Sequence, residues 1–570
     1  MAQTPISSVR RIAAIVAGYL IAASAALDAA LIVSDTGVGV NAESVRYWGG
    51  DFITQDGRRL PGDSVSAVFF VVPKTSAADS TATDRSSGGL REALTPETLA
   101  LVERARRLAA EHPGCGGVHI IDHGEDYLRP DGARVYRYHF LGLALNDDKR
   151  NEWRFVRAGY EDGRSLSRFI MARSIAPDGT VYPLDLSTLT VSTPKQSDGF
   201  INKRGRVISG EIPGVVIGSL IEYVREWELI VPEMKRMVTP GWGFQSDIPV
   251  VSSRFVIDIP DPLEGEFDGL RLQWLGLNLP DGASEPAIEK QDGRARYVWH
   301  IENVAPLISE PDMVAEEDVT MRLEATLYPD WTELMTYYAR IQMDRIVVTD
   351  PISDLARSLT FGITDFDEKV AKLYHWVQQN ITYNSIKSSR SSGWSGHPAQ
   401  ETLDKKFGDC TDVSILFVAL CKAIDVEAYP IYVKTSDAGE SVVELPAPDS
   451  NHCISQVIRP DGTKQYLDCT SDSYRYPYFR SDDHGVWAIN AIKGEIERTP
   501  VPPPTDNLKT TRTIFTLDAD LNATVKETNE YNGSYEAGIR GYWRSVPKER
   551  RLLTMQRYLS SRFPNAVLSG

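Results

Sequence analysis

The stretch KKFGDCTDVSILFVAL, residues 405–420, places a cysteine between two acidic residues directly before a strongly apolar run. Residues 413–421 are apolar nearly all round, which is typical of a helix buried in a core. Cys410 precedes or opens this helix, where the helix dipole and the unpaired first-turn amides favour a thiolate. Asp409 and Asp412 would oppose that effect if they faced the sulfur, but both can cap the helix instead. The sequence therefore predicts a reactive thiol, provided that the helix end outweighs the aspartates.

A thiol nucleophile needs a base, and the base needs a group that orients it. His452 lies 42 residues after Cys410, early in the expected strand NHCISQVI, and Asp468 follows 16 residues later in KQYLDCT. The turn RPDGT at residues 459–463 makes these two strands a hairpin. Neighbouring strands bring cross-strand side chains within hydrogen-bonding reach. We therefore predict a Cys410–His452–Asp468 triad for acyl transfer, with the Cys410 amide as an oxyanion donor.

Three short motifs in this region resemble those of the transglutaminase-like cysteine family, which has a papain-like fold: a GDC at the nucleophile helix, an NH on one strand and a D-x-T on the next. In this chain they read Gly408-Asp409-Cys410, Asn451-His452 and Asp468-Cys469-Thr470. The resemblance covers residues 365–490 and implies attack on an amide of a peptide or of a glutamine side chain. Ser450 replaces an aromatic residue that family members often carry before NH, and Cys469 replaces a proline. These departures bear on specificity and local rigidity, because neither changes a triad atom.

The region before these motifs consists of short alternating runs separated by turn residues, from about residue 118 to residue 327. This pattern predicts one or two antiparallel β-sandwich lobes. The region also resembles the uncharacterised β-rich domain that bacterial secreted proteins place before a transglutaminase-like module. APDGTVYPLD at residues 176–185 and IPGVVIGSLIEYVREW at residues 212–227 carry this resemblance. It implies a bacterial origin.

The predicted fold class is α+β, with antiparallel β-sandwich lobes, a papain-like (transglutaminase-like) core domain and the start of a C-terminal β domain. A helix is expected from Thr95, because proline occupies the first helical position and good helix formers follow. The expected parts are a signal peptide at 1–25, an N-terminal segment with a polar loop and a helix at 26–117, a β-sandwich domain at 118–345, a catalytic domain at 355–498, a Pro-rich linker at 499–507 and a C-terminal β domain at 508–570, which we expect to be truncated.

The N-terminus has the pattern of a secretory signal. Arg10 and Arg11 precede an apolar stretch that begins at about Ile12 and is followed by the small residues Ala-Ser-Ala at 23–25. Asp28 interrupts the apolar run, which weakens the alternative of a spanning helix. We therefore expect an exported protein, periplasmic or extracellular, and keep as the alternative a chain tethered to the inner membrane by an uncleaved N-terminal segment.

Composition narrows the list of partners. The chain has 570 residues and a formal net charge of −17, without a basic footprint, so we expect no nucleic-acid partner. Five cysteines occur, none of them in a CxxC pair, which argues against structural zinc. The triad chemistry requires neither a metal nor an organic cofactor. The expected partner is a protein or peptide substrate, and any membrane contact would come through the N-terminal segment alone.

Several residues near the triad carry open alternatives. Tyr383, Trp394 and Gln400 are candidates for a second oxyanion donor, and Tyr383 resembles in position the aromatic residue that many relatives use. Each could equally be a core or loop residue, and Trp394 could line the substrate groove instead. Cys453 and Cys469 each follow a triad member, so alternation along the strands should point them away from the site. They form a disulfide across the hairpin or remain two buried thiols.

Two further readings of the whole module remain. The first is a catalytically idle transglutaminase-like module whose sandwich lobes bind envelope proteins or glycans. The second is a metal-binding cluster of cysteine and histidine residues. His375 in the expected helix at residues 365–381 and Cys421 at the end of the apolar run are interpreted as structural.

Overall fold

The structure is a computed structural model that describes residues 94–568, except 195–199, 203, 233, 235, 388–393, 521 and 564–565, together with six strands between residues 30 and 70. The predicted signal peptide and the polar loop at 76–89 lie outside the described residues. The chain divides into two compact units, Met1–Ser86 and Ser87–Gly570. Among the helices of the described residues, none combines the length and the apolar character that a bilayer crossing requires.

The first unit contains two small antiparallel sheets that the sequence analysis did not predict. The strand orders are β2-β1-β6 and β3-β4-β5. The strands are β1 (Ala30–Ser34), β2 (Gly39–Ala42), β3 (Val45–Trp48), β4 (Asp51–Thr54), β5 (Arg59–Pro61) and β6 (Val65–Phe70).

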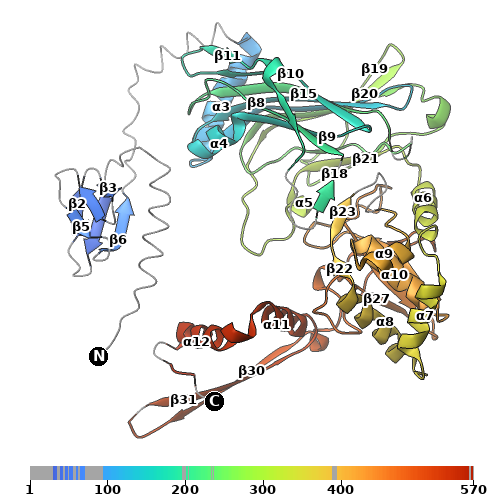
Figure 1. Cartoon of the computed structure of the whole chain (residues 1–570). Coiled ribbons are helices and arrows are strands. Elements are labelled where there is room, and N and C mark those ends of the chain that lie inside the picture. The colour runs from blue at the N-terminus through green and yellow to red at the C-terminus, as the bar shows by residue number, and fades with distance from the viewer. Residues whose placement is uncertain are drawn as a thin grey trace. The chain divides into compact units, whose positions relative to one another are not determined.

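The second unit begins with the expected helix, α3 (Pro96–Glu111). Thr95 caps it by accepting a hydrogen bond from the Thr98 N–H at 3.2 Å, and proline occupies its first turn. The helix packs with an eight-stranded sheet ordered β11-β10-β15-β8-β7-β17-β20-β19 (Figure 1). Its strands are β7 (Gly117–Leu128), β8 (Arg134–Ala144), β10 (Ser165–Ile175), β11 (Val181–Pro183), β15 (Leu220–Leu229), β17 (Val250–Pro260), β19 (Ala287–Gln291) and β20 (Arg294–Val304).

This large sheet is antiparallel, apart from the parallel pair β7 and β17. Antiparallel neighbours can be joined by a hairpin, whereas parallel neighbours need a longer crossover. The chain between β7 and β17 includes β8 to β16, so no hairpin fixes the direction of this pair. The prediction of an antiparallel sheet is correct for every other neighbour in it.

Two smaller three-stranded sheets pack on the large sheet and complete the sandwich lobes. One buries Phe140 and Phe169 of the large sheet against Val156, and the other buries Trp299 against Leu323. The strands of these sheets are β9 (Phe155–Glu161), β12 (Thr190–Ser192) and β14 (Gly205–Glu211), then β16 (Gly241–Gly243), β18 (Gln273–Leu277) and β21 (Arg322–Thr326); the short helices α4 (Asp147–Trp153) and α5 (Glu316–Val319) lie in the same region.

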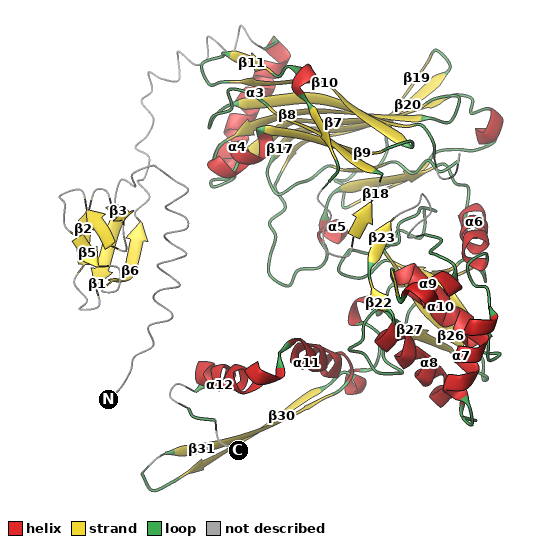
Figure 2. Ribbon diagram, viewed as in Figure 1, coloured by secondary structure: helices red, strands yellow, loops and turns green. Residues whose placement is uncertain are grey.

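The core domain surrounds one buried helix, α10 (Cys410–Lys422), whose residues 410–421 are all buried. It packs against a five-stranded sheet ordered β27-β26-β25-β28-β29, while helices cover its other sides (Figure 2). The helices are α6 (Trp331–Met343), α7 (Asp350–Thr360), α8 (Phe366–Asn380) and α9 (Ala399–Lys405), and the strands are β25 (Ala428–Val433), β26 (His452–Ile458), β27 (Lys464–Leu467), β28 (Trp487–Asn490) and β29 (Glu495–Arg498).

Short parallel pairs connect loops around the start of α10. β22 (Thr382–Tyr383) pairs with β24 (Phe407–Gly408), directly before the helix. β13 (Phe200–Asn202), from the β-rich region, pairs with β23 (Ser385–Lys387). These pairs bring Tyr383 and the loop after α8 to the same end of α10 as Cys410.

The C-terminal region begins with the predicted strands and then becomes helical. β30 (Lys509–Leu517) and β31 (Ala523–Tyr531) form an antiparallel hairpin. Gly533, at φ 59°, turns the chain into α11 (Gly533–Ser545), and α12 (Arg551–Arg562) follows (Figure 1). The expectation of a β domain at 508–570 is therefore correct for the hairpin, whereas the two helices were not predicted.

Candidate active site

The two aspartates that flank Cys410 are used to cap its helix. Asp409 is the N-cap, and its Oδ1 accepts hydrogen bonds from the N–H groups of Thr411 at 3.0 Å and Asp412 at 3.1 Å. The Asp412 Oδ2 in turn accepts from the Asp409 N–H at 3.0 Å, which completes a capping box. Both carboxylates are thus held by backbone amides, in the capping role that the sequence allowed.

This cap leaves one amide in the first turn for another acceptor. The capping box takes the N–H groups of Asp409, Thr411 and Asp412, and it does not take that of Cys410. An N–H at a helix start that the cap does not use can donate to a developing oxyanion. Gly408 is required by the same box, since a Cβ there would lie 2.5 Å from the Asp412 Cβ.

Asp412 has a second partner that the sequence analysis missed. Its Oδ1 accepts from the His397 N–H at 2.6 Å and lies 3.0 Å from His397 Nδ1. Burial alone would raise the pKa of the Asp412 carboxyl, but the hydrogen bonds from His397 and Asp409 lower it below its usual value. The hydrogen bond with Asp412 raises the pKa of His397. His397 therefore anchors the loop before α9 to the cap of the nucleophile helix.

His452 is the first residue of β26, and it lies beside the start of α10. Its Nε2 is 3.2 Å from the Asp468 Oδ2, and its side chain also hydrogen-bonds with Cys410. Because Nε2 faces Asp468, Nδ1 is the ring nitrogen left for the thiol. Burial alone would lower the pKa of His452, but the Asp468 charge and the bonds to Asp468 and Cys410 raise it well above its usual value. The protonated ring is thus favoured beside the sulfur.

Asp468 follows β27 directly and is fully buried. Its Oδ1 accepts a hydrogen bond from the Thr470 N–H at 2.8 Å, so the first and last residues of the D-x-T motif are bonded to each other. Tyr374 of α8 donates to the Asp468 backbone carbonyl at 3.0 Å. Although burial would raise the pKa of the Asp468 carboxyl, His452 and Thr470 lower it. Asn451, by contrast, bonds with Thr435 and fixes the start of β26.

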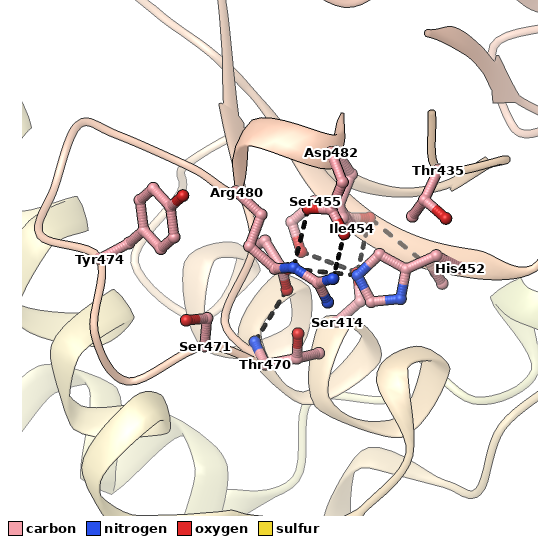
Figure 3. A network of polar contacts seen from close by, with 12 residues as sticks. Ser414, Thr435, His452, Ile454, Ser455, Thr470, Ser471, Tyr474, Arg480 and Asp482 are labelled. Carbon is pink, nitrogen blue, oxygen red and sulfur yellow. Dashed lines mark hydrogen bonds and ion pairs between the residues drawn. The ribbon is translucent and has the colours of Figure 1, made fainter. Parts of the chain in front are cut away.

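Two residues of the loop after β27 also reach the triad, and sequence reasoning missed both. The Arg480 Nε lies 3.7 Å from the Asp468 Oδ2, so Arg480 and His452 approach the same carboxylate. Figure 3 shows Arg480 and His452 in this network of polar contacts. Asp483 is fully buried, and its carboxyl is within 4.8 Å of the facing atoms of His452 and Asp468. A metal ion could use that spacing, but the adjacent guanidinium already supplies a positive charge. We therefore interpret the cluster as one that holds protons.

The three candidates for a second oxyanion donor lie in different surroundings. Tyr383 is 48% exposed in β22, and the pKa of its hydroxyl is raised by burial and by the charges of Cys410, Asp409 and Asp468, so the hydroxyl remains a donor. Trp394 belongs to the cluster that packs around Cys410, where its ring stacks on Tyr338 with centroids 5.2 Å apart.

Gln400 lies on α9, where its amide contacts Thr349 and Asp404. Of the three candidates, Tyr383 has its hydroxyl near the charges of the triad.

The other cysteines are free thiols in the structure. The candidate disulfide between Cys453 and Cys469 is not formed. The pairing of β26 with β27 ends at Ser455 and Leu467, before it reaches either cysteine. Cys469 packs with Cys421 in one core cluster, whereas Cys453 packs with Cys410 in another.

The expectation that Cys453 points away from the site is therefore wrong. It bonds with Ser414 and Thr411 of α10, and burial together with the charge of Cys410 raises its pKa. Cys453 is the second residue of β26 and pairs with Tyr432 of β25, so it follows the pleat. It lies on the same face as Ser455, which bonds with Ser414, and this face packs against α10. His375, interpreted as structural, contacts Gln378 on its own helix at 2.8 Å.

Two parts of the chain match known protein families. Residues 130–308 match the family described as a domain of unknown function with solved structure (DUF3857), and residues 353–469 match the transglutaminase-like superfamily. No curated protein matches the chain.

Several solved structures are similar to the chain. A "putative protease" from Parabacteroides distasonis is 13% identical over 71% of this chain and 78% of its own, with a TM-score of 0.55, which shows a common fold. A "putative cysteine protease" from Cytophaga hutchinsonii is 14% identical over 41% and 72% of the two chains, with a TM-score of 0.19. A structure described as a TGase is 14% identical over 38% and 51%, with a TM-score of 0.16.

Proposed function

Because the chain carries a DUF3857 domain followed by a transglutaminase-like core, we propose that it is a cysteine-dependent acyl-transfer enzyme. The substrate is an amide, either in a peptide bond or in a glutamine side chain of a protein. The observation that carries the proposal is the His452 ring, which bonds through Nε2 with buried Asp468 and also hydrogen-bonds with the Cys410 thiol at a helix start.

The reaction follows from the roles of these three side chains. The Cys410 proton passes to His452, and the sulfur attacks the carbonyl carbon of the amide. The carbonyl oxygen takes the negative charge and accepts from the Cys410 N–H and the Tyr383 hydroxyl. His452 then protonates the leaving amine as the C–N bond breaks, which leaves a thioester. Water or a second amine attacks the thioester after giving its proton to His452, and the thiol is regenerated.

Asp468 contributes orientation and charge. It holds the Nε2 side of His452, so the other nitrogen faces the sulfur, and it stabilises the imidazolium while the thiolate exists. Thr470 and Tyr374 fix this aspartate from two sides. The Asp409–Asp412 box fixes the helix that carries the nucleophile, so each reacting group rests on a supported element.

We also propose that the enzyme works outside the cytoplasm, on protein or peptide substrates. The supporting feature is the N-terminal pattern of two arginines, an apolar stretch and Ala-Ser-Ala at residues 23–25. Expression in a Gram-negative host, followed by fractionation and N-terminal sequencing, tests this. A mature chain that begins after Ala25 is expected in the periplasm, and an uncleaved cytoplasmic chain would contradict export.

The activity itself is tested with a library of glutamine-containing peptides, a fluorescent primary amine and mass spectrometry. The products separate cleavage, deamidation and amine incorporation. Cys410→Ala is expected to abolish conversion, by at least about 10³-fold. The matched control Cys115→Ala, which removes a thiol in the β-rich region, should retain it. Conversion by Cys410→Ala at the wild-type rate, or no product from the wild-type chain, would contradict the proposal and favour the idle binding module.

A further inference from the structure

Asp483 is a buried carboxyl group that the acyl-transfer steps above do not use. It ends the short 3-10 segment Ser481–Asp483 and is fully buried. Among the described residues, neither of its carboxyl oxygens has a hydrogen-bond partner. Buried polar side chains nearly always have such partners, and an ionised carboxylate without one is costly. Asp483 is therefore an exception that calls for a functional explanation.

The backbone holds this side chain in place. The Asp483 N–H donates to the Arg480 carbonyl at 3.2 Å, and the Asp483 carbonyl accepts from the Thr499 hydroxyl at 2.5 Å. Both backbone groups are engaged, so the Asp483 backbone is held at this place, and its side chain is buried there. Its position behind the triad is thus a fixed feature of the fold.

The groups that face Asp483 come from four segments. Asp468 follows β27 and His452 begins β26, and their facing atoms and the Asp483 carboxyl lie within 4.8 Å of one another. Arg480 and Asp482 come from its own loop, and Tyr374 comes from α8. Two ionised carboxylates this close, away from water, repel each other, so the pair holds one proton between them.

Position decides which carboxyl group carries the negative charge. Asp468 has the Thr470 N–H and the His452 ring as donors, and these lower its pKa despite burial. Asp483 has neither, and burial followed by the negative charge of Asp468 raises its pKa to about 8. Near neutral pH, Asp468 is therefore the anion and Asp483 the neutral acid.

We propose that Asp483 is a positioning residue that acts through Asp468 and His452. As a neutral acid it leaves Asp468 as the single anion behind the imidazole, and when it releases its proton to solvent at alkaline pH, the second negative charge keeps the proton on His452. This extends the range in which the imidazolium is available to protonate the leaving amine, and in that respect it rests on the proposed function.

The direct test is an NMR titration of the His452 ring in the full chain, with selectively labelled histidine. The nine histidines give separate signals, and His452→Gln identifies the one of interest. Asp483→Asn is neutral at every pH, so it lacks the negative charge that would hold the proton on His452 at alkaline pH. In this variant His452 is expected to lose its proton about 1 pH unit or more below the wild type, because a charge within about 4–6 Å shifts a pKa by about 1–3 units. Asp520→Asn removes an equal charge from the exposed hairpin turn and should cause no shift.

A second variant protects the test from a folding defect. Asp483→Leu removes the charge together with the hydrogen-bonding atoms at similar volume, and it should shift the His452 titration in the same direction. Either variant that folds and titrates like the wild type would overturn the inference. The NMR readout requires no turnover, so the two proposals can fail separately. A shifted His452 titration, together with conversion by Cys410→Ala at the wild-type rate, would contradict only the proposed enzyme. An unshifted His452 titration, together with loss of conversion in Cys410→Ala, would contradict only the role of Asp483.

Discussion

The eight-stranded sheet and the core domain both bury carboxyl groups, but they treat them differently. In the sheet, each buried carboxyl group has a matched partner: Asp126 contacts Arg134, Glu222 contacts Arg173 and His139, Glu226 contacts Arg137 and Arg168, and Asp258 contacts Arg294. Burial raises the pKa of Asp122 to about 6, and this carboxyl group too has partners, because it accepts hydrogen bonds from Tyr138 and Ser253. In the core, Asp468 faces His452 and, at 3.7 Å, Arg480, while neither carboxyl oxygen of Asp483 has a hydrogen-bond partner among the described residues.

This difference separates structural from chemical charges. A buried carboxylate bound to an arginine has one stable protonation state, since the guanidinium is always charged. A carboxyl group that faces a histidine or another carboxyl group can change state near physiological pH. Apart from Asp122, the sheet therefore uses its buried charges to fix strand pairing, whereas the core holds groups that can exchange protons.

The largest expected effect comes from breaking a pair in the sheet. Arg134 contacts Asp126 through Nε at 3.2 Å and through Nη2, and both side chains are largely buried. Arg134→Met leaves an uncompensated carboxylate and should lower the free energy of unfolding by about 3–5 kcal/mol, measured by urea denaturation. Lys290→Met is the matched control, because its pair with Asp261 is exposed and its loss should leave the free energy of unfolding nearly unchanged.

The same Arg134 variant also tests the separation of roles. Alkylation of Cys410 at neutral pH should keep its wild-type rate, because Arg134 lies in the β-rich region. If Arg134→Met changed that rate while leaving stability intact, the contrast between the two regions would fail.

An intermediate effect is expected at Tyr383. Tyr374 donates to the Asp468 carbonyl, whereas the Tyr383 hydroxyl has no acceptor among the described residues. Burial and the charge of Cys410 raise the pKa of this hydroxyl. Tyr383→Phe should lower kcat/KM for amide conversion by about 100-fold, as expected for loss of one oxyanion donor, with little change in KM. Tyr182→Phe, in an exposed strand of the β-rich region, serves as the control. Unchanged turnover in Tyr383→Phe would exclude this hydroxyl as the donor.

The last effect concerns stability at Asp483 and depends on pH. Because its folded-state pKa of about 8 is above the ordinary value of about 4, its contribution to stability is fully present below pH 4 and is lost as the pH rises to 8. Asp483→Asn has no carboxyl group to ionise at this position, so its free energy of unfolding does not fall for this reason as the pH rises. The variant should therefore gain up to about 4 kcal/mol over the wild type between pH 5 and pH 8.5 in urea unfolding, since each pH unit below the folded-state pKa corresponds to about 1.4 kcal/mol. Parallel stability curves for the two chains would contradict a buried neutral acid.

The features predicted from the sequence are those that local patterns determine. The apolar run after Cys410 predicted a buried helix, and the RPDGT turn predicted the hairpin of β26 and β27. Alternating runs predicted the sandwich lobes, and Thr95 with its following proline predicted α3. Each depends on periodicity, turn chemistry or capping within a few residues.

The features that were missed depend on contacts between distant segments. His397 reaches Asp412 from a loop, and Arg480 and Asp483 reach Asp468 from a segment without periodicity. The one usable signal was composition, because the segment FRSDDHG at residues 479–485 concentrates charged groups after the D-x-T motif. The face of Cys453 was predicted wrongly because alternation along β26 does not show which face of the strand packs against α10.

The central claim is that Cys410 and His452 act as one unit, and the pH dependence of Cys410 alkylation tests it most directly. The rate is read by peptide mass spectrometry in the wild type and in His452→Ala, with Cys115 as the reference thiol in the same digest; burial raises the pKa of Cys115. Alkylation of wild-type Cys410 should persist well below pH 8, and in His452→Ala it should slow or move to higher pH. Cys410 that reacts only at alkaline pH in both chains would contradict the account.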